Sequence, residues 1–335
     1  MTKAIKVGVG VCTRDRPHMF RALLQELAKQ KMPDGTEVIF IFVENSTDIS
    51  ISKTVNRFRE ELIARGIPDP KICIEPEPAE GIGHVRNRML DIAFHFNLDF
   101  LVVADDDEYP EDQNWLNALL CSTHARGLDI ASGLIRDEIL DEEELDSFGL
   151  ISRILYKSLL RKSAENEQKM MDRYRRGEDA RTHHRGSNVI YRLSFLRQHN
   201  IRFKSLGLGR GEDQEIDCEI KEAGGKSGLI PEAIIRERLR DSRLTLHYQF
   251  HTQRANCIVN YGSRGLALSR KNPVIRGSIF VLLRLLSGTA ALLLVPLTGG
   301  RTLLSATWCF GRIVGVVEGL LLGAKSEHYS TTDGC

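Results

Sequence analysis

Apolar segments that look like buried strands alternate with amphipathic segments through the first hundred residues. The strand-like segments are 5–11, 38–43, 71–75 and 100–104. Apolar residues without polar alternation are typical of strands that are covered on both faces. Between the first two, apolar residues have the i, i+3, i+4 spacing of a helix lying on a sheet: Phe20, Leu23, Leu24, Leu27 and Ala28. With further helices at about 50–65 and 84–96, this order predicts a parallel α/β sheet with right-handed crossovers.

The segment Phe100–Glu108, FLVVADDDE, carries the strongest chemical signal. An apolar strand ends in Asp105, Asp106 and Asp107, and parallel sheets bind ligands beyond the carboxyl ends of their strands. Three adjacent aspartates repel one another, so we expect a positive partner there. Mg²⁺ or Mn²⁺ takes such oxygen ligands and bridges to phosphate. The alternative is an exposed acidic turn that caps the helix near Trp115.

The pattern becomes less regular after this strand. It predicts a helix at 115–126, a strand at 129–135, a strand at 186–191 and a helix at 214–223 that Gly224 ends. Seven of the ten residues at 137–146 are acidic, and 157–185 is basic and polar. Segment 136–185 therefore looks like solvated helices around a variable loop, and we interpret it as an insertion.

Two long apolar segments, 279–297 and 303–323, occupy the C-terminal part. Each approaches the roughly 20 residues that cross a bilayer as a helix. The second has small residues at four-residue spacing, which suits close helix packing in lipid: Gly311, Gly315, Gly319 and Gly323. Basic residues precede the pair, as expected beside an anionic cytoplasmic surface: Arg264, Arg270, Lys271 and Arg276. A soluble subdomain covered by an oligomer partner is the alternative, and the pattern leaves open whether the pair spans or lies in the interface.

Composition narrows the classes of function. The chain is 42% hydrophobic and 27% charged with a net charge of +1, which argues against a protein that mainly binds nucleic acid. Seven scattered cysteines without a CxxC pair indicate neither a disulfide framework nor a zinc site, and favour a reducing compartment. The first six residues lead straight into a strand without a signal peptide, so we expect the N-terminal domain to stay in the cytoplasm.

Polar motifs follow the predicted strands or open the predicted helices in a consistent order. They are GVGVCTRDRP, VENSTD, GIGHVRNRML, FLVVADDDEYPEDQNWL, RGSNVIYR, and GRGEDQEID followed by AGG. In this order and spacing the chain resembles the family 2 glycosyltransferases with the GT-A fold, and among them the bacterial exopolysaccharide glucosyltransferases of the succinoglycan type. The resemblance covers roughly residues 5–250. It implies an α/β, Rossmann-like nucleotide-diphospho-sugar transferase domain with a mostly parallel sheet.

The resemblance also implies site residues. Asp213, in the position of the family's "ED" motif, would be the general base, and Asp105 and Asp107 would hold Mn²⁺ or Mg²⁺. The donor UDP-sugar would contact seven residues: Thr13, Arg14, Glu44, Arg86, Asn87, Asp105 and Asp106. The acceptor would contact Glu212, Asn188 and Trp115, although Trp115 could equally join a helix to the sheet. Arg243, near His247, is a further candidate for a phosphate contact.

These inferences predict an organisation and a function. We expect a glycosyltransferase domain at 1–250 with the 136–185 insertion on its acceptor side, a basic connection at 251–276, a membrane-associated hairpin at 277–324 and a polar tail at 325–335. The enzyme would move a hexose, glucose by resemblance, from a UDP-sugar to a lipid-linked oligosaccharide of surface polysaccharide, on the cytoplasmic face of the plasma membrane and without a nucleic-acid partner.

Two alternatives stay open. A sugar-phosphate nucleotidyltransferase would need a glycine-rich, lysine-bearing loop after the first strand, and CTRDRP has neither feature. A non-catalytic membrane-bound scaffold that binds nucleotide sugar would have no need of Asp105, Asp107 and Asp213, which are all present.

Overall fold

The computed structural model describes residues 4–178, 186–204, 211–262 and 273–322, and a mixed eight-stranded sheet forms its centre. The strand order is β3-β2-β1-β4-β7-β6-β8-β5. Four of the neighbouring pairs are parallel and three are antiparallel, because β7 and β5 run against the other strands. The strands are β1 (Ile5–Thr13), β2 (Thr36–Glu44), β3 (Lys71–Pro76), β4 (Phe100–Asp105), β5 (Glu108–Pro110), β6 (Ile130–Asp137), β7 (Val189–Arg192) and β8 (Ser227–Glu237).

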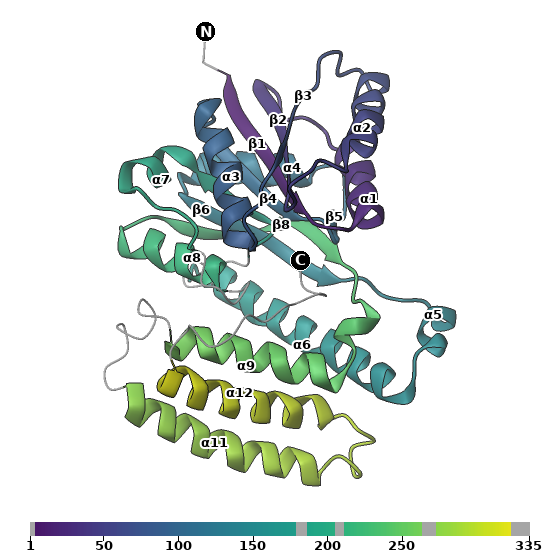
Figure 1. The fold of residues 1–335 in the computed structure, drawn as a ribbon, viewed down its shortest axis with the longest axis vertical. Helices are drawn as coiled ribbons and strands as arrows, with labels where there is room; N and C mark the ends of the chain where they lie inside the picture. Colours follow the sequence, from purple (N-terminus) through teal and green to yellow (C-terminus); the bar gives the residue numbers. More distant parts are fainter. Residues whose placement is uncertain (1–3, 179–185, 205–210, 263–272, 323–335) are drawn as a thin grey trace.

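Helices cover both faces of this sheet (Figure 1). One core cluster joins the sheet to α1 (Pro17–Ala28), α2 (Ser52–Ala64) and α4 (Trp115–Arg126). The other joins it to α3 (Ile82–His95), α7 (Leu193–His199) and α8 (Glu212–Glu222). Because both faces are buried, the central strands are almost continuously apolar, as in β4. The predicted α/β class is confirmed.

The sequence pattern does not anticipate β8, and the structure shows why. Pro231 and Glu232 interrupt its apolar run, and a proline argues against a regular ladder. The pairing with β6 is irregular at this place: Ser132 lies opposite Leu229, whereas Leu134 lies opposite Ile234. Gly133 sits at the irregularity, where a Cβ atom would be only 1.8 Å from the Ala233 carbonyl oxygen.

Segment 136–185 forms two helices within its described part. The short α5 (Glu142–Ser147) begins at Asp141, whose side chain accepts a hydrogen bond from the Glu144 backbone N–H. The 26-residue α6 (Leu150–Arg175) is largely solvated but packs against β6 and against a C-terminal helix. Residues 179–185 of the predicted variable loop lie outside the described residues.

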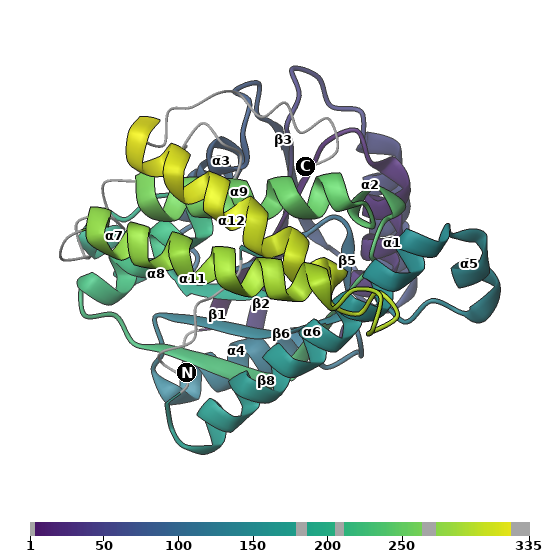
Figure 2. The ribbon, with the colours of Figure 1, turned by 90° about the horizontal axis from the view of Figure 1, so that it is seen from below.

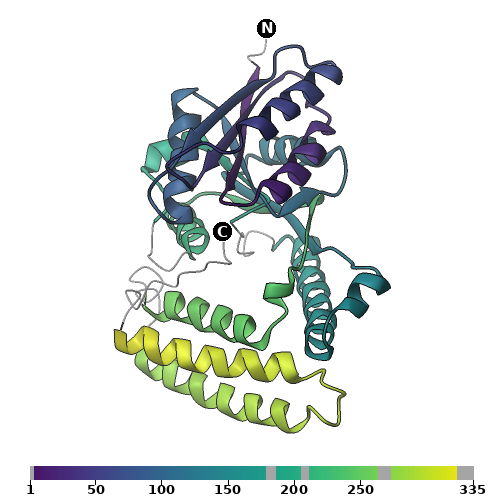
Figure 3. The ribbon, with the colours of Figure 1, turned by 45° about the vertical axis from the view of Figure 1, so that its right-hand side comes forward.

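Three helices form a separate layer below the sheet (Figures 1 and 3). After a short 3₁₀ turn, η2 (Asp241–Arg243), they are α9 (Leu246–Gly262), α11 (Pro273–Leu293) and α12 (Leu303–Leu322). The predicted apolar hairpin is confirmed as α11 and α12, which are both long and apolar enough to cross a membrane. Helix α9 runs across residue 250, where the sequence pattern places the end of the first domain. Arg264, Arg270, Lys271 and Gly323 lie outside the described residues.

Candidate active site

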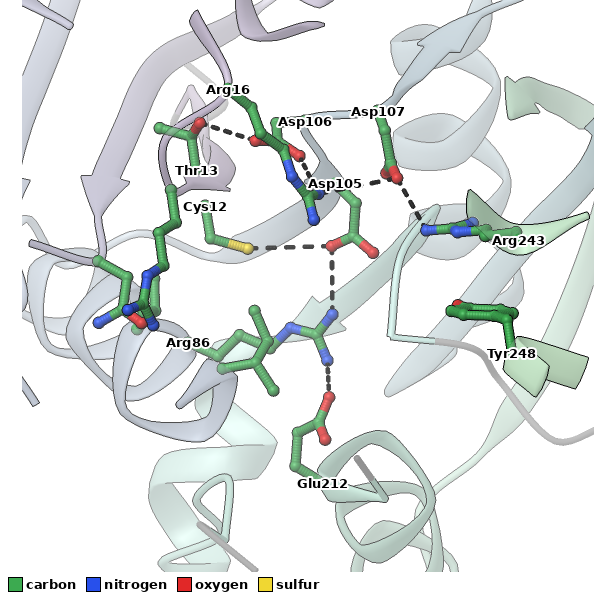
Figure 4. A pocket seen from close by; sticks show the side chains of 14 residues that line it. Cys12, Thr13, Arg16, Arg86, Asp105, Asp106, Asp107, Glu212, Arg243 and Tyr248 are labelled. Carbon is green, nitrogen blue, oxygen red and sulfur yellow. Dashed lines mark hydrogen bonds and ion pairs between the residues drawn. The ribbon is translucent and has the colours of Figure 1, made fainter. Parts of the chain in front are cut away.

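A pocket lies beyond the carboxyl ends of the neighbouring strands β1 and β4, where the sequence pattern predicts a binding site (Figure 4). The two strands are parallel neighbours, and their register pairs Cys12 with Asp105. The pocket is lined by eight charged residues, Arg14, Arg16, Arg86, Asp105, Asp106, Asp107, Glu212 and Arg243, and by Cys12, Thr13, Asn45, Ile82, Val85 and Tyr248. It therefore brings together residues that are more than 200 positions apart.

Asp106 anchors the loop after β1. Its carboxylate accepts hydrogen bonds from Thr13 Oγ1 at 2.7 Å and from Arg16 Nη1 at 3.1 Å, and the residue is only 3% exposed. Burial raises the pKa of Asp106 to about 6, against the opposing effects of Arg16 and Thr13. Because both carboxylate oxygens are bonded within the protein, Asp106 holds the pocket wall in place.

Asp107 is surrounded by guanidinium groups. Its Oδ2 accepts from Arg240 Nη2 at 2.7 Å and from Arg243 Nη2 at 2.9 Å, and Arg16 Nη1 is 3.8 Å away. Arg243 is itself paired with Glu237, whose charge raises the pKa of Arg243 against the effect of burial. Asp107 thus connects the end of β4 to the segment between β8 and α9.

Arg86 bridges two carboxylates below the pocket. Its Nη1 donates to Glu212 Oε1 at 2.6 Å and its Nη2 donates to Asp105 Oδ1 at 3.3 Å. The arginine is only 3% exposed, and burial raises the pKa of both carboxyl groups while Arg86 opposes that rise. Gly186 allows the approach, because a Cβ atom there would be 2.3 Å from Nη1. The bridge joins α3, β4 and the start of α8.

The described lining of the pocket is balanced in formal charge, with four carboxylates and four guanidinium groups. A nucleotide diphosphate brings several negative charges, and a divalent cation that entered with it would restore much of the balance. Within the described residues, no three His, Cys, Asp or Glu side chains converge on a metal position. Mg²⁺ commonly uses one or two carboxylates together with substrate phosphates. Asp105 and Asp107 therefore fit a metal that binds together with a diphosphate.

A second cleft lies on the other side of the Arg86–Glu212 bridge. It shares Arg86, Asp105, Glu212, Arg243 and Tyr248 with the first pocket and extends to α6, α9 and α12. Asp213 lines only this cleft, in the first turn of α8, and its Oδ1 accepts from the Gln214 backbone N–H at 2.8 Å. Among the described residues, six acidic and three basic ones line the second cleft, namely Asp105, Glu108, Asp137, Glu212, Asp213, Glu237, Arg86, Lys162 and Arg243.

Most of the predicted site residues do lie at these two cavities. Thr13, Arg14, Arg86, Asp105, Asp106 and Asp107 line the pocket, Glu212 lines both cavities, and Asp213 lines the second cleft. Both terminal nitrogens of the Arg86 guanidinium are bonded to carboxylates, and its contact with the donor stays a prediction. Arg14 is the more accessible arginine, with its side chain 39% exposed and paired with Glu80.

The side chains of two residues predicted to contact the donor are bonded within the protein, and their donor contacts stay predictions. Glu44 is buried and accepts hydrogen bonds from the backbone N–H groups of Ser50 and Ile51, so it holds the turn before α2. The Asn87 amide donates to the Phe203 carbonyl oxygen at 2.7 Å and accepts from the Phe203 N–H at 3.0 Å. Neither residue lines the pocket, where Asn45 takes the place expected for Glu44.

The side chains of two residues predicted to contact the acceptor are likewise buried and bonded within the protein. Trp115 is fully buried, and its Nε1 donates to Asn188 Oδ1 at 2.8 Å. Asn188 is also fully buried, and its Nδ2 donates to the carbonyl oxygens of Leu134 and Ala233. The pair joins α4 to the sheet. This agrees with the alternative that the pattern left open for Trp115.

The residues that sequence reasoning missed are mainly arginines. Arg16 lies within the CTRDRP motif, but the sequence analysis assigned it no role. No motif contains Arg240, which follows the unpredicted strand β8. Tyr248 opens α9 and lines both cavities. Arg243, which was predicted as a phosphate contact, lines both cavities, whereas His247 lines neither of them.

Comparisons with known proteins agree with the motifs. No protein-family model matches the chain. It is 26% identical over 245 residues to the succinoglycan biosynthesis protein ExoM of Rhizobium meliloti (strain 1021), an alignment covering 73% of this chain and 70% of ExoM. It superimposes with a TM-score of 0.59 on the mannosyltransferase PcManGT of Pyrobaculum calidifontis, solved with GDP-Man and Mn²⁺, over 96% of this chain and 88% of that one at 15% identity. The predicted resemblance is confirmed, and the chain has the α/β fold of the GT-A glycosyltransferases.

Proposed function

We propose that the chain is a metal-dependent, inverting glycosyltransferase of family 2 that uses a UDP-hexose as its donor. The observation that carries the proposal is the meeting of the Asp105–Asp107 triplet with arginines from two distant segments, directly beside the cleft that holds Asp213. The similarity to ExoM, a succinoglycan biosynthesis protein, supports it. So does the likeness to PcManGT, which was solved with a nucleotide sugar and Mn²⁺.

The pocket suits the nucleotide part of the donor. Asp107 and Asp105 would hold the divalent metal, which when bound acts as a Lewis acid on the leaving diphosphate. Arg16 and Arg243 lie beside Asp107 and would pair with diphosphate oxygens. The apolar Ile82 and Val85 give the nucleoside a surface in the same pocket.

The second cleft suits the acceptor. An acceptor hydroxyl oxygen would bond to the anomeric carbon while the bond from that carbon to the diphosphate breaks, and Asp213 would take the hydroxyl proton as general base. The Arg86–Glu212 bridge holds the first turn of α8, which sets the position of Asp213. Helix α6 lines the cleft, in support of an acceptor-side role for segment 136–185.

The charge of the second cleft indicates which part of the acceptor enters it. Its described lining is rich in carboxyl groups, among them Asp137, Asp213 and Glu237. Carboxylates accept hydrogen bonds from sugar hydroxyls. We therefore place the neutral glycan end of a lipid-linked oligosaccharide in the cleft, with the enzyme on the cytoplasmic face of the membrane.

A transfer assay tests this proposal. Membranes that contain the protein would be incubated with radiolabelled UDP-glucose or UDP-galactose and Mn²⁺, and label would be followed into lipid-extractable oligosaccharide. We expect incorporation from one of the two donors and none with the Asp213→Asn variant. Conversion of a sugar 1-phosphate and UTP to a UDP-sugar, with no label in the lipid fraction, would indicate a nucleotidyltransferase instead.

A further inference from the structure

The outer face of α11 is a large exposed apolar surface. Figure 2 views the molecule from this side, with α11 and α12 in front of the other elements. Leu282 and Leu286, one helical turn apart, are 58% and 64% exposed. The same helix and the turn after it expose further large apolar side chains: Val274, Ile275, Ile279, Leu283, Leu293 and Leu297. A continuous surface of this kind marks an interaction site.

The charged residues of α11 and of the turn after it have one sign. Residues 273–304 contain no aspartate or glutamate, and their three charged residues are Arg276, Arg284 and Arg301. A second copy of the chain would bring the same positive charges against this face. A bilayer with anionic lipids would instead attract them. Charge complementarity therefore favours an anionic lipid surface as the occupant.

Helix α12 is attached to a polar helix on its other side. Trp308 Nε1 donates to Gln249 Oε1 at 2.9 Å, and Arg312 Nε donates to Gln253 Oε1 at 2.7 Å. Arg254 of α9 pairs with Glu318 through two hydrogen bonds, at 2.6 and 3.0 Å. These contacts keep α12 beside α9 over several turns.

The stripe of small residues on α12 reinforces this attachment. A Cβ atom at Gly315 would be 2.1 Å from the Arg254 carbonyl oxygen, and one at Gly311 would be 2.4 Å from that of Phe250. The stripe thus allows close helix packing, as the sequence pattern predicts, and its described glycines pack on α9 of the same protein. Helix α12 lies between α9 and α11 (Figures 1 and 3).

The position of the active site limits how deeply the layer of α9, α11 and α12 can enter a membrane. Helix α9 carries Tyr248, which lines the nucleotide pocket, so α9 cannot move into a membrane without the pocket. If α12 crossed the bilayer, Gln253 and Arg254 of α9 would enter hydrocarbon with it, at a high cost. We propose that the protein binds the surface of an anionic bilayer through the outer face of α11, which lies in the plane of the membrane, and that neither α11 nor α12 crosses it.

Vesicle binding tests the surface. The full chain would be sedimented with vesicles of phosphatidylethanolamine and phosphatidylglycerol, and with vesicles of phosphatidylcholine alone. We expect binding to the anionic vesicles that weakens with salt and falls at least tenfold in the Leu282→Glu/Leu286→Glu variant. Ile63→Glu, an exposed residue of α2 on the far side of the molecule, is the matched control and should bind as wild type. UDP binding by both variants checks that they are folded.

Two results would overturn this part of the proposal. One is vesicle binding that the double substitution leaves unchanged. The other is a detergent-free dimer that the double substitution dissociates, without any vesicle binding, which would identify a second copy as the occupant. The outcome is independent of transferase activity, because no sugar donor is present.

Cysteine labelling tests the orientation. Thr298 lies in the turn between α11 and α12, so a spanning hairpin would place it on the far side of the membrane. In intact cells, a Thr298→Cys variant should resist a membrane-impermeant maleimide and become labelled after lysis. The chain with its natural cysteines provides the background. Labelling of the added cysteine in intact cells would show that the hairpin crosses.

Discussion

Each aspartate of the Asp105–Asp107 triplet is balanced by an arginine, and this pairing explains how three adjacent carboxylates coexist. Asp105 pairs with Arg86 of α3, Asp106 with Arg16 of the β1–α1 loop, and Asp107 with Arg240 and Arg243 beyond β8. A charged ligand must therefore replace existing ion pairs. A metal with a diphosphate can do so, because it presents a cation to the aspartates and anions to the arginines.

Asp213→Asn separates chemistry from donor binding. Asparagine keeps the size of the side chain but cannot take a proton from the acceptor hydroxyl. General-base catalysis contributes roughly 10²–10⁴-fold, so we expect kcat to fall by at least about 100-fold. UDP affinity should be unchanged, because Asp213 lines only the second cleft. Kinetics and a UDP titration on the same preparation check both statements, and a parallel loss of UDP binding would refute the assignment of the base.

Asp106→Asn changes the pH dependence of stability. The folded-state pKa of about 6 lies above the ordinary aspartate value of 3.8, so the protonated carboxyl contributes stability that is lost as pH rises through about 6. This rise in pKa corresponds to about 3 kcal/mol. Asparagine does not titrate, so the free energy of unfolding of wild type should fall by about that amount relative to the variant between pH 4 and 7. Denaturant titrations at several pH values measure it, and parallel curves would contradict it.

At the scale of elements, the contact between α9 and α12 connects the helix layer to the active site. The glycines of α12 let the two backbones approach, and the ion pair of Arg254 with Glu318 adds a specific polar contact. The N-terminal end of α9 carries Tyr248 into the pocket. A change in this contact should therefore affect the site as well as stability.

Gly315→Ala tests this contact. The added Cβ would lie 2.1 Å from a backbone oxygen of α9, so the helices must separate. Overpacking of this kind costs about 1–3 kcal/mol, which we expect as a loss in the free energy of unfolding. Gly149→Ala is the control, because nothing lies within 4 Å of a Cβ atom there and its φ is −64°. Equal stability of the two variants would argue against a close α9–α12 contact.

The sequence pattern predicted the elements whose apolar periodicity is regular and missed those whose signal is local or interrupted. Helix α4 was predicted at its observed bounds, because Gly127 ends it in a left-handed conformation. Strand β8 was missed because Pro231 breaks its pattern, and α7 because it is only seven residues long.

The sequence predicts those site residues that lie directly after a strand or in the first turn of a helix. Asp105 and Asp107 follow a predicted strand, whereas Asp213 was indicated by the resemblance to the family's "ED" motif. Glu44, Asn87, Trp115 and Asn188 lie at or near comparable positions, but a sequence cannot show that a polar side chain is already bonded within the protein. Arg240 was missed because the fold brings it to Asp107 from more than 130 residues away.

At the scale of the whole molecule, the second cleft lies between the Asp105–Asp107 pocket and the helix layer. Its lining comes from the edge of the sheet and α8 on one side and from α9 and Trp308 of α12 on the other. In the arrangement that we propose, α11 rests on the membrane, the glycan end of a lipid-linked acceptor enters the cleft, and the donor occupies the pocket beyond the Arg86–Glu212 bridge. An acceptor held in the bilayer would then reach Asp213 without leaving its lipid.

The central claim is that the Asp105–Asp107 pocket binds a nucleotide diphosphate together with a divalent metal. A calorimetric titration of UDP into the purified chain, with and without Mn²⁺, tests it most directly, with Asp107→Ala measured in parallel. We predict binding that requires Mn²⁺, absent in the variant, with little Mn²⁺ binding in the absence of UDP. UDP binding of equal strength without metal or in Asp107→Ala would place the metal ligand elsewhere, and no binding of UDP in either condition would contradict the proposed donor.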